Sequence, residues 1–434
     1  MTTEAFIPEH LRNPPRAEVI YTVISVDDHL VEPPEMFEGR LPARFADRAP
    51  RVVTLEPGQA VARKSTQITT GDGSATMAGR QAWEYEGKLY TQVGLNAVAG
   101  RTDFRAQRTE PTSFADMRPG CFDVHARIAD MDLAGIWASV NFPSVITGFC
   151  GTVFAKSDDR DLGRAVMQAW NDWFFEDWYG PYPQRMVPMG ITWLTDPVLG
   201  AEEVRRNAAR DFRAVTLPEL PHWLDLPAIG TGYWDPILGA CEETDTAICL
   251  HVGSSGLLPM PEGDRAFEKS ITLFPAYSLL ACVEWLWSGV AVRFPGLKIV
   301  MAEGGIGWVP MLLDRLDFIA THAAQGADWD GDLTPVEVLQ RNFWFCTLDD
   351  PSTLPALQRI GADRVMLETD YPHSDSTWPK SQSLLHTRFS DPAAGLTPED
   401  IRLVTHANAA KVFRHPLPAT PSWRHDADQA ELTR

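Results

Sequence analysis

The sequence predicts an α/β protein, a closed (β/α)8 barrel of parallel strands, and three observations support this fold. Eight short apolar runs rich in β-branched residues recur along the 434-residue chain. Segments with helical periodicity separate these runs, as expected for strands that are buried on both faces. No run is followed by G-x-G-x-x-G or by a Walker lysine motif, which disfavours an open nucleotide-binding sheet.

The predicted strands follow one another along the chain. They cover 21–26 (YTVISV), 138–143 (ASVNFP), 185–191 (RMVPMGI), 212–217 (FRAVTL), 246–252 (TAICLHV), 297–303 (LKIVMAE), 343–348 (FWFCTL) and 363–370 (DRVMLETD). Helix-like segments lie between them, for example DLGRAVMQAWNDWFFEDWY. In that segment Trp170, Trp173, Phe174 and Trp178 recur on one helical face, so we expect this face to pack in the core.

The chain is predicted to form a single barrel domain over residues 20–415, with an insertion at 40–119 after the first strand. The insertion is rich in Gly, Thr, Arg and Pro and shows little periodicity. We expect a partly ordered segment over the barrel mouth that serves as a lid or a dimer contact. Residues 416–434 are expected to be a surface tail, and the protein is expected to be a homo-oligomer, a dimer in the simplest case.

Composition and charge exclude several classes of function. The chain has 38 Lys and Arg against 58 Asp and Glu, and the net charge of −20 is unsuited to nucleic acid or an anionic membrane. Its 6 scattered cysteines fit a reducing compartment. The N-terminus lacks signal-peptide features, and the most apolar stretch is interrupted by Glu284. We therefore expect a cytoplasmic protein that acts on a small molecule.

Polar residues end several predicted strands, and the C-terminal strand ends of a barrel form its active site. Asp27 and His29 follow the first strand, and their spacing places both on one side of an extended backbone. His251 ends the fifth strand, Glu303 the sixth and Asp370 the eighth. Each residue alone is also compatible with a structural role, such as a buried histidine or a turn cap. Their coincidence at separate strand ends favours a site for zinc or a harder divalent metal.

Six motifs, in order along the chain, resemble those of the amidohydrolase-related family, which includes aminocarboxymuconate-semialdehyde decarboxylase and γ-resorcylate decarboxylase. They are VDDHLVEPPEMF (26–37), MDLAGIWASVNFPS (131–144), LHVG (250–253), FPGLKIVMAEGGIGWVPMLLDRLD (294–317), ETDYPHSDSTWP (368–379) and NAAKVF (408–413). The resemblance covers most of the chain outside the insertion and the tail. It implies a (β/α)8 barrel with one divalent metal ion.

The resemblance also implies which residues bind the metal. Family members carry His-x-His or Glu-x-His at the end of the first strand, where this chain has Asp27 and His29. The family's fifth-strand histidine matches His251, and its eighth-strand aspartate matches Asp370. Many members have a histidine at the end of the sixth strand, whereas this chain has Glu303. Zinc is the metal we expect first, and the oxygen donors make manganese or iron competitive.

Three residues are candidates for the chemistry beside the metal. Glu303 could act as the general base, as a fifth ligand or as a group that orients a ligand histidine. Asp370 is a candidate for proton transfer as well as for metal binding, and His373 is the next candidate at the rim. Asp28 and Glu32 are predicted to lie behind the ligands.

Two reactions of a small organic molecule fit these residues. In hydrolysis of an amide, ester or lactone, a metal-bound water attacks a polarised carbonyl. In non-oxidative decarboxylation of an aromatic or unsaturated acid, the metal holds the carboxylate and a neighbouring oxygen, and an acid protonates the carbanion. The family name and the candidate base Glu303 favour hydrolysis, with decarboxylation as the alternative. A metal-free glycosidase would leave His29 and His251 unexplained, and a non-catalytic barrel would not need four ligands.

Overall fold

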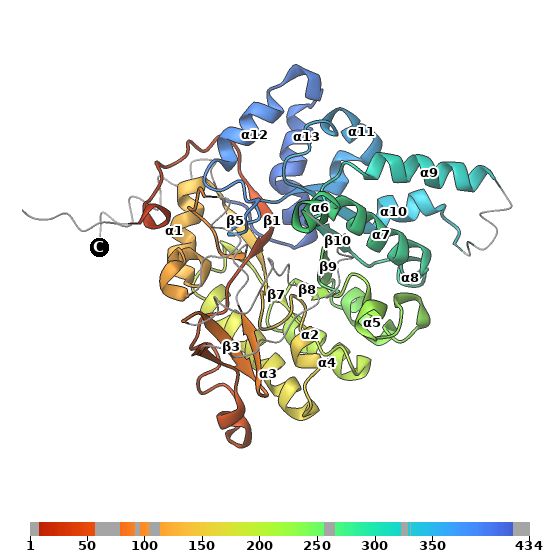
Figure 1. Cartoon of the computed structure of the whole chain (residues 1–434). Helices are drawn as coiled ribbons and strands as arrows, with labels where there is room; N and C mark the ends of the chain where they lie inside the picture. The colour runs from red at the N-terminus through yellow and green to blue at the C-terminus, as the bar shows by residue number, and fades with distance from the viewer. Residues whose placement is uncertain are drawn as a thin grey trace, which may run out of the picture.

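Parallel strands form the centre of the molecule and helices lie around them (Figure 1). The computed structural model describes residues 8–56, 79–91, 96–103, 113–255, 265–322, 329 and 331–419. The central strands are β1 (Ile24–His29), β5 (Ala138–Phe142), β6 (Met186–Val187), β7 (Met189–Gly190), β8 (Ala214–Leu217), β9 (Ala247–His251), β10 (Ile299–Ala302), β11 (Phe343–Thr347) and β12 (Val365–Leu367). They pair in parallel in the orders β1-β5-β6 and β7-β8-β9-β10-β11-β12.

The two runs of strands close into one barrel. Pro188 lies between β6 and β7, and because proline has no N–H to donate, these strands are two parts of one interrupted strand. On the other side, Asp370 N donates to Asp27 O at 2.9 Å and His29 N donates to Tyr371 O at 2.7 Å. These bonds join β1 to the chain that follows β12. The predicted (β/α)8 barrel is confirmed, and each predicted strand overlaps an observed one. The first strand was placed too early, because β1 ends three residues after its predicted end and contains Asp27 and His29.

Side chains of the strands alternate between the barrel interior and the surrounding helices. On β9, Ala247 and Cys249 pack with the inner residues of other strands, whereas Ile248 and Leu250 pack among helix residues. All residues of these central strands are buried, which explains their uninterrupted apolar runs. His251 is the next residue on the inner face of β9, and it therefore lies at the barrel mouth.

Helices lie between the strands and after the last one, and most of them bury apolar residues. They are α1 (Val124–Ala134), α2 (Thr152–Ala155), α3 (Arg160–Trp173), α4 (Pro197–Ala208), α5 (Asp235–Glu243), α6 (Ala266–Thr272), α7 (Phe274–Trp287), α8 (Val290–Arg293), α9 (Val309–Thr321), α10 (Pro335–Asn342), α11 (Leu357–Ile360), α12 (Ser381–Phe389), α13 (Pro398–Arg402) and α14 (Asn408–Val412). Asp123, Asp159 and Asp196 accept backbone N–H bonds at the starts of α1, α3 and α4. The predicted aromatic face is confirmed in the core, since Trp170 and Phe174 are completely buried.

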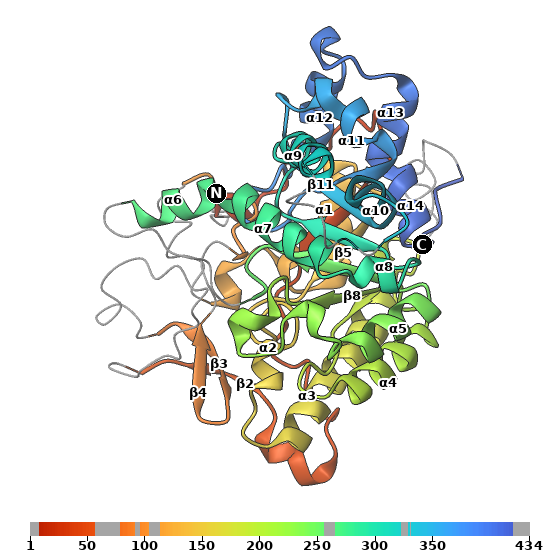
Figure 2. The ribbon, with the colours of Figure 1, turned by 90° about the vertical axis from the view of Figure 1, so that its right-hand side faces the viewer.

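The described part of the insertion contains a small sheet that the sequence did not predict. Its antiparallel strands are β2 (Arg51–Thr54), β3 (Gln81–Tyr85) and β4 (Lys88–Thr91), in the order β2-β3-β4 (Figure 2). The ring of Trp83 lies 5.7 Å from that of Phe37, and Tyr85 Oη donates to Ser157 Oγ at 3.1 Å. These three strands have only four or five residues each, too few for an alternating apolar pattern to stand out in the sequence.

The rest of the insertion and the tail are described only in part. Within the insertion, 57–78, 92–95 and 104–112 lie outside the described residues, so its role as a lid or a dimer contact stays a prediction. Val98 N donates to Pro372 O at 2.9 Å, which places one insertion segment beside the chain that follows β12. Of the predicted tail, 420–434 lies outside the described residues. Among the helices that the structure describes, none has the length and apolarity needed to cross a bilayer.

The aromatic core between α3 and the barrel is expected to contribute strongly to stability. Phe174 is completely buried, so Phe174→Ala should lower the free energy of unfolding by about 3–5 kcal/mol through lost burial and a residual cavity. Chemical denaturation followed by circular dichroism measures this change. Met311, 56% exposed on α9, is the control, and Met311→Ala should change the free energy by less than about 0.5 kcal/mol. Equal effects of the two substitutions would contradict the assignment of this core.

Candidate metal centre

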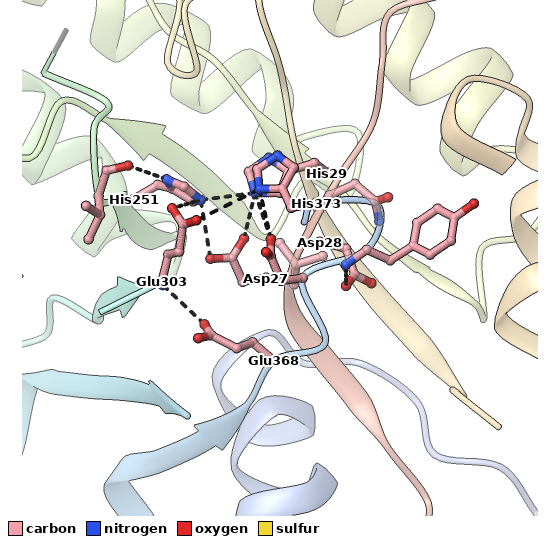
Figure 3. Close-up of polar contacts among 12 residues, drawn as sticks. Asp27, Asp28, His29, His251, Glu303, Glu368 and His373 are labelled. Carbon is pink, nitrogen blue, oxygen red and sulfur yellow. Dashed lines mark hydrogen bonds and ion pairs between the residues drawn. The ribbon is translucent and has the colours of Figure 1, made fainter. Parts of the chain in front are cut away.

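Asp27, His29 and His251 meet at the C-terminal ends of β1 and β9 (Figure 3). Nε2 of His29 lies 3.4 Å from Asp27 Oδ1 and 3.0 Å from Nε2 of His251. Asp27 Oδ2 lies 3.5 Å from His251 Nε2. The three side chains are buried, and each directs a potential ligand atom into one small volume.

A β-bulge in β1 sets the direction of these side chains. The pairing of β1 with β5 shifts register between Ser25 and Asp28, where β1 has one residue more than its partner. A bulge bends the strand locally and re-aims the side chains near it. Asp27 and His29 face the site, whereas Asp28 contacts side chains of neighbouring strands.

Asp28 ties the bulged strand to both of its neighbours. Its carboxylate accepts hydrogen bonds from Thr369 Oγ1 at 2.7 Å, from Tyr371 N at 2.9 Å and from Ser139 Oγ. Ser25 Oγ donates to the same carboxylate at 3.0 Å. Burial raises the pKa of Asp28, and these hydrogen bonds oppose the shift. Asp28 therefore lies behind the ligand residues, as predicted, and fixes the relative positions of β1, β5 and the chain after β12.

The hydrogen bond of His251 determines which of its nitrogens faces the site. Nδ1 of His251 lies 2.7 Å from Val252 O, an acceptor only, so Nδ1 carries the proton and donates it there. The Nε2 lone pair then points at Nε2 of His29 and at the carboxylates. Burial lowers the pKa of both histidines, so both rings are neutral at neutral pH. Neutral imidazoles are the form that binds metal ions.

Asp370, Glu303 and His373 complete the cluster on its other side. Asp370 Oδ1 lies 3.4 Å from His29 Nε2 and 3.1 Å from His373 Nδ1. Glu303 Oε2 lies 3.1 Å from His251 Nε2. The His29 and His373 rings stack with their centroids 3.6 Å apart. The structure thus brings together all six residues that the sequence singled out for the site.

The backbone is unusual where two of these acids leave their strands. Glu303 has φ 58° and Asp370 has φ 53°, the left-handed region that residues with a Cβ rarely adopt. Asp370 N donates to Asp27 O, and Glu303 N donates to Glu368 Oε2 at 3.2 Å. These bonds hold the two strained residues in place, and such strain is concentrated at functional sites.

The buried carboxylates destabilise one another when no cation is bound. Burial raises the pKa of Asp27 well above its usual value, and the charges of Glu368 and Glu303 add to the shift. Burial also raises the pKa of Asp370 well above its usual value, with Asp375 and Glu303 as the next causes. Both shifts have the sign expected for a site that has more negative charge than its surroundings neutralise.

Unpartnered atoms show that these residues fit a divalent cation. Both carboxylate oxygens of Asp27 and of Asp370 are buried and have no hydrogen-bond partner. Leaving such atoms unpaired costs about 1–3 kcal/mol each. Nε2 of His29 and Nε2 of His251 face the same volume, and two nitrogens with two or three carboxylate oxygens suit zinc, manganese or iron. Asp27, His29, His251 and Asp370 could hold the ion, and the ligand roles stay a prediction.

Three further acids near the mouth were missed by the sequence reasoning. Glu368 follows β12 and is buried beneath Asp27 and Glu303, where burial raises its pKa well above the usual value (Figure 3). Asp375 groups with Glu303, Asp370 and His373 as a second set able to hold a cation. Burial raises the pKa of Glu219 to about 8, and Glu219 accepts a hydrogen bond from Gly253 N at 2.7 Å. Glu219 and Asp375 follow predicted strands by two and five residues, and Glu368 lies near the end of the predicted strand 363–370, so a search of the strand ends could have found them.

Glu32 lies apart from the ligand cluster. Its carboxylate accepts hydrogen bonds from Ser144 N at 2.9 Å, from Ser144 Oγ at 2.7 Å and from Trp170 Nε1 at 3.3 Å. These bonds fasten the loop that follows β5 to the helical layer. Glu32 therefore shapes the wall of the site through that loop, and it has no contact with the candidate metal ligands among its hydrogen bonds.

Comparison with known proteins identifies the family. The family model described as Amidohydrolase matches residues 91–415. The chain belongs to the amidohydrolase family. Gamma-resorcylate decarboxylase of Polaromonas sp. strain JS666 is 23% identical to this family member over 279 residues, which are 59% of this chain and 79% of that protein. The resemblance read from the six motifs is confirmed.

Two solved structures show the same fold. An amidohydrolase from Mycobacterium avium subsp. paratuberculosis K-10 is 23% identical, with a TM-score of 0.65 over 91% of this chain and 100% of that one. A dihydroxybenzoic acid decarboxylase from Polaromonas sp. JS666 was solved with bound manganese and the inhibitor 2-nitroresorcinol. It is 15% identical, with a TM-score of 0.57 over 91% of this chain and 97% of that one.

Removing a predicted ligand should abolish metal binding. We expect the wild-type protein to bind about one divalent ion per chain in this site, and Asp27→Ala and His251→Ala to bind none tightly, because each loses a ligand atom. Elemental analysis of the purified proteins measures the content. Asp349, an exposed acid paired with Arg388, is the control, and Asp349→Ala should keep the metal. Retention of the metal by both ligand variants would contradict this assignment.

Metal binding should release protons and strengthen as the pH rises. Without metal, the raised pKa values of Asp27 and Asp370 keep both acids partly protonated above their usual range. Manganese must displace these protons, whereas His29 and His251 are already neutral because their pKa values are lowered. Titration calorimetry of the metal-free protein at pH 6 and pH 8, in buffers of different ionisation enthalpy, measures the release. An affinity independent of pH would contradict the electrostatics described here.

Proposed function

We propose that this protein is a metal-dependent, non-oxidative decarboxylase of a small aromatic or unsaturated carboxylic acid. The observation that carries the proposal is that the Nε2 atoms of His29 and His251 face unpartnered, buried carboxylate oxygens at the barrel mouth. That arrangement suits a divalent ion at the place where barrel enzymes bind substrate. The curated relatives similar to this chain are named as decarboxylases, which supports decarboxylation over hydrolysis.

The metal is proposed to be divalent, with manganese at least as suitable as zinc. The donor set of Asp27, His29, His251 and Asp370 combines two nitrogens with carboxylate oxygens, and oxygen donors favour harder ions. The related dihydroxybenzoic acid decarboxylase was solved with manganese. An ion held by these residues would supply positive charge that binds the substrate carboxylate and a neighbouring oxygen.

His373 is proposed to supply the proton that the reaction consumes. Nδ1 of His373 faces Asp370 Oδ1 at 3.1 Å and Glu303 Oε1 at 3.9 Å, and both oxygens are acceptors. The Nδ1 proton is thereby held toward the acids, while Nε2 is buried without a partner. A protonated Nε2 can donate to the ring carbon when the carbon–carboxylate bond breaks and its electron pair stays on that carbon. Carbon dioxide leaves, and the ring keeps the proton.

Glu303 and Asp370 are proposed to keep His373 oriented during this step. Their carboxylate oxygens lie 3.9 Å and 3.1 Å from Nδ1 of His373, so they hold that edge of the ring and leave Nε2 directed away from them. Glu303 is also 12% exposed in its side chain, which places it next to the entry for substrate or water. That exposure is the one observation that favours hydrolysis as a second candidate, with Glu303 as the base for a water molecule.

Direct assay of carbon dioxide release tests the proposal. Manganese-loaded protein should decarboxylate hydroxylated benzoates, with 2,6-dihydroxybenzoate as the first probe, and His373→Asn should lower kcat by about 10²–10⁴-fold with unchanged metal content. His322, exposed on the surface after α9, provides the matched control, and His322→Asn should retain full activity. Hydrolysis of esters or lactones by protein that releases no carbon dioxide from a panel of acids would reverse the order of the two candidates.

A further inference from the structure

We propose that Phe149 is the specificity-determining residue of this site, forming the apolar wall against which a substrate ring packs above the metal ligands. The proposal rests on the proposed function, because it concerns the substrate that the same site selects. Phe149 lies in the loop after β5, between Ser144 and α2. No motif of the sequence singled it out.

The ring of Phe149 contacts both candidate ligand histidines. Its centroid lies 5.3 Å from that of His251 with an interplanar angle of 34°, and 5.7 Å from that of His29 with an angle of 75°. Phe142, at the end of β5, contacts the same two rings at 4.9 Å and 5.7 Å but is completely buried. A molecule bound at the candidate ligand atoms would therefore meet an aromatic surface on the side of Phe149, the partly exposed ring of the two.

Exposure distinguishes Phe149 from the rest of its loop. The loop residues from Ser144 to Gly148 and Cys150 are buried, whereas Phe149 is half-buried. Around the site, Asp27, His29, His251 and Asp370 are at most 1% exposed. The more accessible side chains among these neighbours are Phe149 and Glu303, both half-buried, and Asp375, which is exposed. Solvent, and hence substrate, is expected to reach the cluster past a phenyl ring and two carboxylates.

The backbone holds Phe149 in a conformation that phenylalanine rarely adopts. Its φ is 68°, and it follows Gly148 at 72° and precedes Gly151 at 87°. The left-handed region is unfavourable for a residue with a Cβ and open to glycine. Phe149 N donates to Thr147 Oγ1 at 3.1 Å and to Ser144 O at 3.2 Å. The loop thus keeps a strained aromatic residue where glycine would be easier, and such strain points to a role for the side chain.

The ring of Phe149 should discriminate between planar aromatic acids and open-chain acids. An aromatic ring adjacent to Phe149 gains an offset-stacked or edge-to-face contact in addition to burial of apolar area. An open-chain unsaturated acid of similar length has only a narrow chain of conjugated carbons, so it gains less contact with the Phe149 ring. Phe149 should therefore favour planar rings over open chains, without contributing to binding of the metal itself.

Two substitutions at Phe149 separate recognition from structure. Phe149→Leu keeps an apolar side chain but removes the ring, and it should raise KM for 2,6-dihydroxybenzoate about 10-fold with little change in kcat. The inhibition constant of sorbate, an open-chain conjugated acid, should change less than about 2-fold. Phe149→Gly removes the strained Cβ, and it should lose the same preference while its Tm stays at or above that of the wild type.

An exposed phenylalanine far from the site provides the control for the Phe149 variants. Phe318 is 42% exposed on α9, and Phe318→Leu should leave KM, the sorbate constant and metal content unchanged. Equal changes for both acids in Phe149→Leu, or no change, would overturn the assignment of Phe149. A lower Tm in Phe149→Gly would also overturn it, because a ring that only packs the core predicts that result.

The same variants distinguish failure of this inference from failure of the proposed function. If the wild type releases no carbon dioxide, binding of 2,6-dihydroxybenzoate and sorbate to manganese-loaded protein is measured by calorimetry. Weaker binding of the ring acid alone to Phe149→Leu then supports the role of Phe149 while decarboxylation is rejected. Turnover by the wild type with an unaltered Phe149→Leu rejects only the inference. If the manganese-loaded wild type neither turns over nor binds the ring acid, both are rejected.

Discussion

Closure of the barrel between its first and last strands is the constraint on which the site depends. Asp370 N donates to Asp27 O, and His29 N donates to Tyr371 O, so the same two bonds that complete the ring also align three site residues. The carboxylate of Asp28 strengthens this seam because it accepts hydrogen bonds from both strands. The hydrogen bonds that close the barrel therefore also fix the positions of these site residues.

The electrostatics of the mouth are unfavourable for the protein alone. Burial, together with the surrounding acids, raises the pKa values of Asp27, Asp370 and Glu368, while burial lowers those of His29 and His251. Each group is therefore displaced toward its neutral form. A divalent ion reverses the penalty on the carboxylates and uses the lone pairs of the neutral imidazoles, so binding of the ion would relieve the strain that folding creates.

Buried acids hold the two loops beside the proposed substrate site. Glu32 holds the loop after β5 through Ser144, and Glu219 holds the loop after β9 through Gly253. Cys150 Sγ lies 3.5 Å from Ser254 O, which connects the two loops directly. Phe149 lies between Ser144 and Cys150 in the chain, and its N–H donates to Thr147 Oγ1 and Ser144 O. Variation of the loops on a rigid barrel allows one fold to act on many substrates. In this protein, the proposed substrate wall on such a loop is the aromatic ring of Phe149.

The sequence by itself determined the barrel and the composition of the candidate site. Buried parallel strands must be apolar along their whole length, so eight such runs were visible, and the polar residues that end them, such as His251 and Asp370, stood out by contrast. The insertion sheet was not visible because its strands are too short to establish a period.

Only the tertiary structure decided how these residues meet. The bulge in β1 depends on pairing with β5, and the tautomer of His251 depends on a carbonyl next to it in space. The exposure of Phe149 depends on which neighbours bury the rest of its loop. Register, hydrogen-bond partners and burial are properties of contacts between segments far apart in the chain, and a linear pattern of residue types does not encode them position by position.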